Sequence, residues 1–392
     1  MRFSAIQTLC GIHTIRRALG LVKRYGNLYN SVYDMQNLEL AHRHAKKGKG
    51  WYREVKQLEK NLTGGLRVIR QLLLSHDYKT SDYEMFLKQE GNKVRKIYKL
   101  PYFPDRVVQW ALMQVVSPYI EKHFIRDTYS AIPNRGIHDG LKRVQKVMYT
   151  KQDECRFCWK FDVRHYYQRI VHEILFAQYC RMFKDVDLLW LIYEIIGSIN
   201  TIDQEDIEEM QARGLEVNPN CGVPIGNYFS QWSGNFYLSP FDHWIKEKMG
   251  VKHFYRYMDD GVVFHSDKDY LHELKDKSSE FIWSELRLNF KDNWQIFPTY
   301  VRGVDYLGYR IFDNYTLLRK KTIKNIKQSC KRIGTKVRNG NLMSYSDFCS
   351  LNSHMGWVES GDCFRFGGKY LMPLADDACR FYMDEIWAGD YR

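Results

Sequence analysis

Hydrophobic and polar positions along the chain follow a helical period in some stretches and a strand period in others, which predicts a mixed structure. Apolar residues at three- and four-residue steps predict helices over 107–125, 137–147, 185–197 and 228–248. No internal repeat or low-complexity linker separates the elements. The chain is therefore predicted to fold as one interleaved unit.

Two segments have the composition of β-hairpins. Around Glu90-Gly91-Asn92, β-branched and aromatic residues predict a hairpin over 83–100, whose return strand is rich in lysine and arginine. Around Asp259-Asp260-Gly261 they predict a second, tight hairpin over 254–265. Carboxylates at the tip of a hairpin are unusual enough to mark it as a candidate for chemistry.

The segment from Arg319 to Arg338 predicts one amphipathic helix. It holds nine Lys and Arg and no Asp or Glu, while apolar residues recur at three- and four-residue steps from Ile323 to Val337. The apolar stripe is expected to pack, which leaves the basic face to lie along a phosphate backbone or merely to be solvated. The candidate nucleic-acid contacts are Arg319, Lys320, Lys321, Lys324, Lys327 and Lys331.

Residues 198–221 differ in character from their surroundings. Five acidic residues cluster between Asp203 and Glu209 without a strand-type apolar period, which predicts an exposed acidic insertion. Solvated acidic loops are far commoner than metal sites, so no metal is assigned to it.

Length, composition and net charge restrict the architecture of the chain and the classes of molecule that it is expected to bind. A chain of 392 residues exceeds the size of one hydrophobic core and predicts two or three lobes. The excess of 59 Lys and Arg over 46 Asp and Glu gives a net charge of +13 and favours polyanions, either nucleic acid or acidic lipid. No apolar stretch approaches the roughly 18 residues of a membrane span, and the opening 24 residues lack a secretory signal, so a cytoplasmic location is expected.

Nine scattered cysteines are unlike a disulfide framework, and reduced thiols are expected. Cys155 and Cys158 form a C-x-x-C, but no second pair follows at zinc-ribbon spacing. Packed, inert thiols are the favoured interpretation of this pair.

Three aspartates offer the donors for two-metal nucleotidyl transfer, in which carboxylates bridge two divalent ions. Asp162 ends a predicted strand over 157–163, and Asp259 with Asp260 stands in the second hairpin. Magnesium prefers such oxygen ligands. An isolated aspartate at a strand end is usually a cap or a turn residue, so the order and context of all three carry the prediction.

These residues bring out a family resemblance. Tyr257-Met258-Asp259-Asp260 resembles the Y-x-D-D motif of reverse transcriptases, and Phe161-Asp162-Val163 resembles their first palm aspartate motif. The resemblance implies an α+β right-hand polymerase fold with an antiparallel palm sheet. It places an N-terminal extension of uncertain role over 1–24, mainly fingers over 25–161, mainly palm over 162–315 and a basic helical thumb over 316–392.

The same resemblance implies a set of site residues. Two Mg²⁺ ions, with Mn²⁺ as the alternative, would be held by Asp162, Asp259, Asp260 and the backbone carbonyl of Val163. The triphosphate would be held by Lys93 and Arg95, whose charges suit phosphate oxygens. Lys291 is a candidate general acid for pyrophosphate, or a simple charge support. The template is assigned to Arg135 and Gly136, and the primer grip to Leu307 and Gly308 within Val304–Tyr309.

Tyr167 stands five residues after the first aspartate, where the family resemblance implies a gate against the ribose 2′-hydroxyl. A bulky ring there favours deoxynucleotides. The alternatives are that Tyr166 is the gate, or that Tyr167 is an ordinary core tyrosine.

The segment from Ile225 to Gln231 narrows the resemblance further. It is similar to the [I/V/L]-G-x-x-x-S-Q signature of reverse transcriptases from diversity-generating retroelements, and it assigns Ile225, Gly226 and Gln231 to the nucleotide site. Ile225 offers shape but no hydrogen bonds, which weakens rejection of a wrong base pair. Misincorporation opposite template adenines is therefore expected, and Asn227 is expected to cap the helix that follows.

The resemblance thus implies an RNA-directed DNA polymerase that copies a template-repeat RNA from a DNA or RNA primer with deoxynucleoside triphosphates. A small basic accessory variability protein is an expected partner. The alternatives are a group II intron-type or other bacterial reverse transcriptase without a mutagenic role, and a catalytically silent RNA-binding scaffold. A membrane-surface protein is the least favoured, since charge alone cannot separate RNA from lipid but the aspartates can.

Overall fold

The computed structural model describes residues 24–90, 93–215 and 220–381, which form two compact units. The first unit comprises the described parts of Met1–Ile132, Asp162–Gly250 and Asp276–Asp292. The second comprises the described parts of Pro133–Phe161, Val251–Lys275 and Asn293–Arg392. The chain passes between the units several times, as expected for an interleaved fold.

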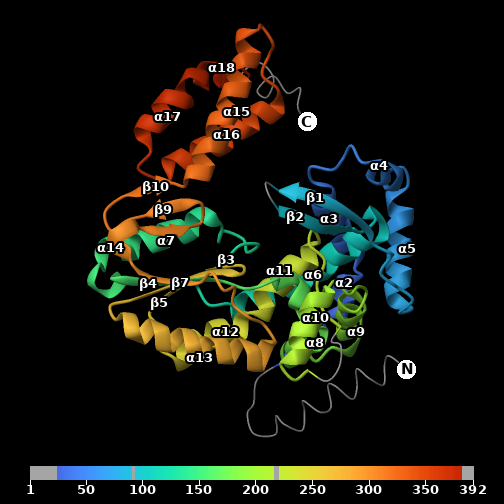
Figure 1. Ribbon diagram of the computed structural model, residues 1–392. Coiled ribbons are helices and arrows are strands. Elements are labelled where there is room, and N and C mark those ends of the chain that lie inside the picture. The colour runs from blue at the N-terminus through green and yellow to red at the C-terminus, as the bar shows by residue number, and fades with distance from the viewer. Residues whose placement is uncertain (1–23, 91–92, 216–219, 382–392) are drawn as a thin grey trace. The chain divides into compact units, whose positions relative to one another are not determined.

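The first unit is mainly helical (Figure 1). Its central helix, α6, contacts α2, α3 and α11 and buries apolar residues along most of its length, as its sequence predicts. The elements of this unit are α2 (Tyr29–Val32), α3 (Met35–Lys46), α4 (Arg53–Glu59), α5 (Leu62–Leu74), β1 (Glu84–Glu90), β2 (Lys93–Lys99), α6 (Val107–His123), β3 (Thr128–Tyr129), α8 (His172–Met182), α9 (Val186–Ile196), α10 (Gln204–Ala212), α11 (Tyr228–Tyr237) and α12 (Ser239–His243).

The hairpin predicted near residue 90 is present as β1 and β2. The strands are antiparallel, with Lys88 opposite Arg95 and Glu90 opposite Lys93. Gly91 and Asn92, the predicted tip, lie outside the described residues. The register confirms that the basic segment Lys93–Lys99 is the return strand of this hairpin, as predicted.

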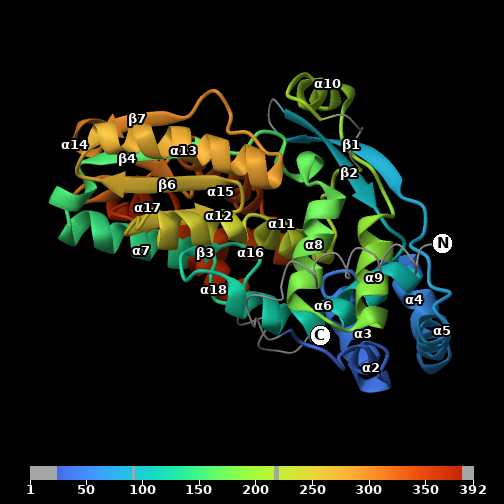
Figure 2. The same ribbon diagram turned by 90° about the horizontal axis from the view of Figure 1, so that it is seen from below.

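The second unit holds two antiparallel sheets and most of the C-terminal helices. Figure 2 shows β7, β4 and β6 of the larger sheet side by side; the strands of this unit are ordered β5-β6-β4-β7, and α7 contacts β5. The elements are α7 (Ile137–Thr150), β4 (Phe157–Asp162), β5 (His253–Tyr257), β6 (Asp260–His265), β7 (Gln295–Pro298), α14 (Thr299–Arg302), β8 (Val304–Tyr306), β9 (Tyr309–Ile311), β10 (Thr316–Leu318), α15 (Lys320–Arg338), α16 (Tyr345–Glu359), α17 (Phe364–Tyr370) and α18 (Ala375–Phe381). The last residue of β4 belongs to the first unit, and α13 (Lys268–Leu286) continues from the second unit into the first.

The predicted amphipathic helix is confirmed as α15. Ile326, Cys330 and Ile333 are buried, whereas the lysines at 320, 321, 324, 327 and 331 are exposed. Helix α16 lies beside α15 (Figure 1). The apolar stripe therefore packs within this unit, and the basic face is turned to solvent.

The predicted exposed acidic insertion is only partly exposed, and the expectation was wrong for its central helix, α10. Asp206 is 0% exposed, and Met210 belongs to a small apolar cluster with Val171 and Cys221. Asp206 Oδ2 lies 2.8 Å from His165 Nδ1, and Glu209 Oε2 lies 3.4 Å from Arg169 Nη1. The acids thus pair with His165 and with the buried Arg169, which precede them by about forty residues, a relation that local charge counting cannot detect.

The turn between α15 and α16 is closed by a buried aspartate. Asp347 forms a capping box with Ser344 and accepts hydrogen bonds from Arg332 Nη1 (2.7 Å) and Lys336 Nζ (2.8 Å). Burial opposes ionisation of Asp347, but the hydrogen bonds from Lys336, Ser344 and Arg332 outweigh it and hold the pKa well below its usual range. Ionised Asp347 thus stabilises the pairing of these two helices.

Replacing Asp347 with Asn is expected to lower the free energy of unfolding by about 1–3 kcal/mol, because the amide lacks the negative charge that pairs with Arg332 and Lys336 and keeps only one of the two acceptor oxygens. A depressed folded pKa gives stability that is present above the unfolded value near about 4 and is lost as the pH falls through the folded value. The deficit measured by urea denaturation should therefore be full at neutral pH and shrink in acid. Asp376→Asn, at an exposed position of α18, is the matched control; equal loss in both variants would contradict the assignment.

Candidate active site

The Asp259–Asp260 pair lies at a two-residue turn in the second unit. The register of β5 and β6 pairs Tyr257 with Asp260, so only Met258 and Asp259 remain in the turn. Met258 has a φ of 54°, a left-handed conformation that costs energy for a side chain of this size. Buried Arg256 donates from Nη1 to the Met258 carbonyl (2.7 Å) and supports that conformation.

A glycine contact fixes the spacing between β6 and its neighbour β4. A Cβ atom added at Gly261 would lie 2.3 Å from Cζ of Phe161, so only glycine fits against that ring. Phe161 also stacks on Phe254 of β5, with ring centroids 6.4 Å apart. Phe161 near the end of β4 therefore lies directly beside Gly261 at the start of β6.

Asp162 and Lys291 form an ion pair in the first unit. Lys291 Nζ lies 2.6 Å from Asp162 Oδ1, and the Lys291 N–H donates to the Asp162 carbonyl (2.8 Å). Arg164 N–H donates to the Asn289 carbonyl (2.8 Å), which completes an antiparallel bridge between Val163 and Phe290. Both hydrogen bonds of the bridge come from flanking residues, so the carbonyl of Val163 is not used in this pairing.

The predicted metal ligands are oxygen donors, the type that a hard divalent cation prefers. Three carboxylates and one backbone carbonyl are the oxygen ligands that magnesium prefers, and the Val163 carbonyl lies outside the bridge hydrogen bonds. The aspartates are divided between the two units, with Asp162 in the first and the other two in the second. Within 24–90, 93–215 and 220–381, no single cluster of three or more His, Cys, Asp or Glu side chains is placed to hold a metal ion.

Tyr166 and Tyr167 lie in the short helical turn Tyr166–Arg169 in different environments. Tyr166 is buried, and its hydroxyl donates to the Gly234 carbonyl of α11. Tyr167 is half-buried, and a Cβ added at Gly234 would lie 3.3 Å from its ring. The Tyr167 carbonyl accepts from Val223 N–H (2.9 Å), which ties this turn to the segment before Ile225.

Ile225 and Gly226 form a turn before α11. Gly226 has a φ of 110°, and a Cβ there would lie 3.8 Å from Cγ2 of Ile97 on β2. Ile225 is half-buried and brings only an aliphatic side chain to the turn. Asn227 occupies the N-cap position of α11, but its side chain makes no capping hydrogen bond, so the predicted cap is wrong. The asparagine instead lines a pocket together with Gly226 and Gln231.

The basic residues assigned to the fingers hairpin lie on β2. Arg95 is exposed and stands opposite Lys88, while Lys93 stands opposite Glu90. Lys96, which was not assigned to the site, pairs with Asp203 just before α10. This contact connects the hairpin to the acidic segment within the first unit.

The residues assigned to template and primer lie in the second unit. Arg135 and Gly136 immediately precede α7, and Gly136 is its N-cap. Leu307 and Gly308 form the turn between β8 and β9, with φ values of 52° and 86°. Arg319, a predicted phosphate contact, forms an ion pair with Asp305. Its charge is therefore partly balanced, unlike that of the exposed lysines of α15.

Cys155 and Cys158 are packed thiols, as predicted. Both are buried, and burial raises the pKa of Cys155 to about 12 and that of Cys158 further. A thiolate is therefore disfavoured at either position.

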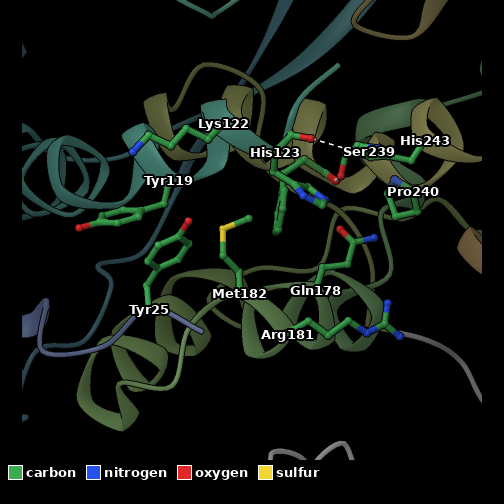
Figure 3. A pocket seen from close by; sticks show the side chains of 11 residues that line it. Tyr25, Tyr119, Lys122, His123, Gln178, Arg181, Met182, Ser239, Pro240 and His243 are labelled. Carbon is green, nitrogen blue, oxygen red and sulfur yellow. Dashed lines mark hydrogen bonds between the residues drawn. The ribbon is translucent and has the colours of Figure 1, made fainter. Parts of the chain in front are cut away.

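A separate cavity of about 460 Å³ lies in the first unit between α6, α8 and α12 (Figure 3). Tyr25, Tyr119 and Met182 face it, and His123 and His243 meet at one side. Burial disfavours charge on His243, but hydrogen bonds to Glu247 (2.6 Å) and to the His123 carbonyl (2.7 Å) outweigh it and raise its pKa. None of the site residues predicted from the sequence lines this cavity.

Comparisons with known proteins identify relatives. A family model described as Reverse transcriptase (RNA-dependent DNA polymerase) matches residues 87–311. Protein YkfC of Escherichia coli (strain K12) is 26% identical over 196 residues, 49% of this chain and 48% of that protein, so the chain spans about half the length of this curated relative. A solved structure of telomerase from Candida albicans, in complex with a TWJ fragment of telomeric RNA, has a TM-score of 0.45 at 11% identity and covers 79% of this chain and 61% of its own.

Across the described part of the chain, no helix combines the length and apolar character needed to cross a membrane.

Proposed function

Because this chain belongs to the reverse transcriptase family, we propose that it copies an RNA template into DNA. The 3′-hydroxyl of a DNA or RNA primer attacks the α-phosphorus of a deoxynucleoside triphosphate. The new O–P bond forms while the bond to pyrophosphate breaks, and the proton of the hydroxyl is released to water. The enzyme is thus a nucleotidyltransferase, and its α+β class, that of a right-hand polymerase, agrees with the prediction from the sequence.

The observation that carries this proposal is the β5–β6 turn with its neighbour β4. The turn presents Asp259 and begins β6 at Asp260, and β4, whose final residue is Asp162, is the next strand of the sheet. The close approach of Gly261 and Phe161 fixes the position of these two strands along each other. This arrangement supports the proposal that the three carboxylates act as one group.

In this proposal Asp162, Asp259, Asp260 and the Val163 carbonyl would hold two magnesium ions. Bound there, the metal would supply activation of the attacking hydroxyl and neutralisation of charge on the leaving pyrophosphate. Lys291 stands 2.6 Å from Asp162 and places a cation beside that carboxylate, from where it balances charge on pyrophosphate or gives it a proton. Lys93 and Arg95 bind the triphosphate, Arg95 by forked hydrogen bonds.

The remaining assignments concern the nucleic acid. Arg135 and Gly136 contact the template, and Leu307 with Gly308 supports the primer terminus. The exposed lysines of α15 follow the phosphate backbone, where each neutralised phosphate releases counterions and strengthens binding at low salt.

Asp162→Asn, Asp259→Ala and Asp260→Ala are each expected to lower primer extension on an RNA template by about a thousandfold or more, since the lost carboxylate supplies several kcal/mol of stabilisation. Radiolabelled primer extension with deoxynucleotides and Mg²⁺ measures the effect. Asp313→Asn, in a loop of the second unit, is the control and should keep full activity. Extension at the unmodified rate in the three aspartate variants would refute the proposed mechanism.

We propose Tyr167 as the gate against ribonucleotides, because its ring is half-buried whereas the hydroxyl of Tyr166 is bound inside the unit. Tyr167→Ala is expected to reduce the preference for deoxynucleotides by about tenfold or more, since the excluded volume is lost. Competition between dATP and ATP in single-nucleotide extension measures it. Tyr166→Phe keeps the neighbouring ring and should leave the preference unchanged; an unchanged preference in Tyr167→Ala would remove the gate from Tyr167.

We further propose that the enzyme is error-prone at template adenines and serves a diversity-generating retroelement, on the basis of Ile225 and the signature it opens. Ile225→Gln adds an amide at the turn and is expected to lower misincorporation opposite template adenine by about tenfold. Sequencing of cDNA made on one RNA template measures this. Ile225→Leu, which keeps an apolar side chain, is the matched control, and identical error spectra for all three enzymes would rule the role out.

The same signature supports a small basic accessory protein as partner. Co-purification of such a protein with the full chain would test this, and a chain that synthesises template-repeat cDNA equally well without it would remove that partner.

A further inference from the structure

The pocket beside Gly226 has a polar lining of which the assignments above use only Gly226 and Gln231. It measures about 200 Å³ and lies within the first unit, between the turn after α3, the start of α6 and the start of α11. Gly226 and Gln231 were predicted as nucleotide-site residues. The other lining residues are Lys49, Arg106, Gln109, Trp110, Asn227 and Tyr228.

Two cations face this pocket without a counter-ion. Lys49 and Arg106 are both half-buried, and neither forms an ion pair with any residue that the structure describes. Arg106 donates from Nε to the Leu100 carbonyl at 3.4 Å. Burial and, secondly, the positive charge of Arg106 lower the pKa of Lys49. The two charges repel each other, and an anion between them would offset that repulsion.

Two buried amides add hydrogen-bond donors. Gln109 is 2% exposed and Asn227 is 4% exposed, and both line the pocket. Gln109 Nε2 and Asn227 Nδ2 have no hydrogen-bond partner among the described residues. Buried polar groups are nearly always paired in folded proteins, and those that are not call for a ligand or water. An oxygen-rich group in the pocket would supply both acceptors.

The size and the aromatic side of the pocket restrict the ligand further. Trp110 and Tyr228 stack with centroids 3.8 Å apart and an interplanar angle of 9°. Aromatic rings next to cations are typical of single-stranded nucleic-acid sites. Pockets that hold a whole small molecule usually exceed about 300 Å³. A cavity of 200 Å³ fits one anionic group rather than an entire nucleotide.

We propose that this pocket binds one phosphate group of a nucleic-acid strand or nucleotide, with Lys49 and Arg106 neutralising it and Gln109 and Asn227 donating hydrogen bonds. The source of the phosphate, but not its chemistry, rests on the proposed function. We expect the unpaired strand of the RNA template, because Lys93 and Arg95 are assigned to the triphosphate. The pocket adjoins Gly226, so a strand held there would pass next to the Ile225 turn.

The test uses the full chain without divalent metal and two probes, a labelled single-stranded RNA oligonucleotide and dATP. Lys49→Gln and Arg106→Gln are each expected to weaken RNA binding about tenfold and to lower the slope of log K against log salt by about one. Gln109→Leu should weaken RNA binding severalfold without changing that slope, because it removes donors but no charge. Lys47→Gln, an exposed lysine in the same turn, is the matched control and should change affinity less than twofold.

Folding is checked separately by the thermal midpoint. Lys49→Gln removes a repulsive charge and should keep or raise the midpoint without ligand, so it carries the test even if Arg106→Gln does not fold. If dATP binding falls while RNA binding does not, the site is a phosphate site filled by the nucleotide. Wild-type binding of both probes by Lys49→Gln and Gln109→Leu would overturn the proposal, as would equal loss in Lys47→Gln, which would indicate only the general positive field.

These measurements need no catalysis. If the chain fails to extend primers but the pocket variants lose RNA affinity, the polymerase assignment is refuted and the phosphate pocket is supported. If the chain extends primers and all pocket variants bind normally, the phosphate pocket is refuted and the polymerase assignment is supported.

Discussion

The two-residue turn between β5 and β6 is the constraint on which the candidate active site depends. The pairing of Tyr257 with Asp260 leaves only two residues for the turn, so Asp259 lies in the turn and Asp260 begins the strand. The left-handed conformation of Met258 is unfavourable alone and is held by the buried guanidinium of Arg256. Gly261 then allows the ring of Phe161 to approach. A buried arginine and one glycine thus fix where two carboxylates leave the sheet.

Charge balance organises the first unit. Asp162 is paired with Lys291, and the acids of α10 face the cations that follow Asp162, including the fully buried Arg169. Removing one partner of such a pair would leave the other charge unpaired inside the protein, at a large cost in folding free energy. The pairs are therefore needed to keep these charges buried. Lys49 and Arg106 depart from this rule, since the described residues offer them no carboxylate. A place where the protein leaves its charges unbalanced is a place where a ligand can balance them.

The sequence predicted features that depend on neighbours along the chain. Both hairpins and the helix α15 are specified by alternation, turn residues and helical spacing within about twenty positions, and the structure confirms them. Relations across the chain were not predictable. The Asp162–Lys291 pair joins residues 129 positions apart, and the burial of Asp206 depends on Arg169 and His165. Asn227 is a residue type that often caps helices and it stands at the N-cap position of α11, yet its side chain makes no capping hydrogen bond and lines a pocket instead. No pattern in the neighbouring sequence predicts that pocket.

The turn at Leu307 and Gly308 is joined to helices α15 and α16 by direct contacts. The Gly308 carbonyl accepts from Arg319 N–H (2.9 Å) and Thr322 Oγ1–H (3.2 Å) at the start of α15. Trp357 of α16 lies so near that a Cβ at Gly308 would be 2.6 Å from its ring. No hinge separates this loop from the two helices, so a tilt of the helix pair would displace the loop with it.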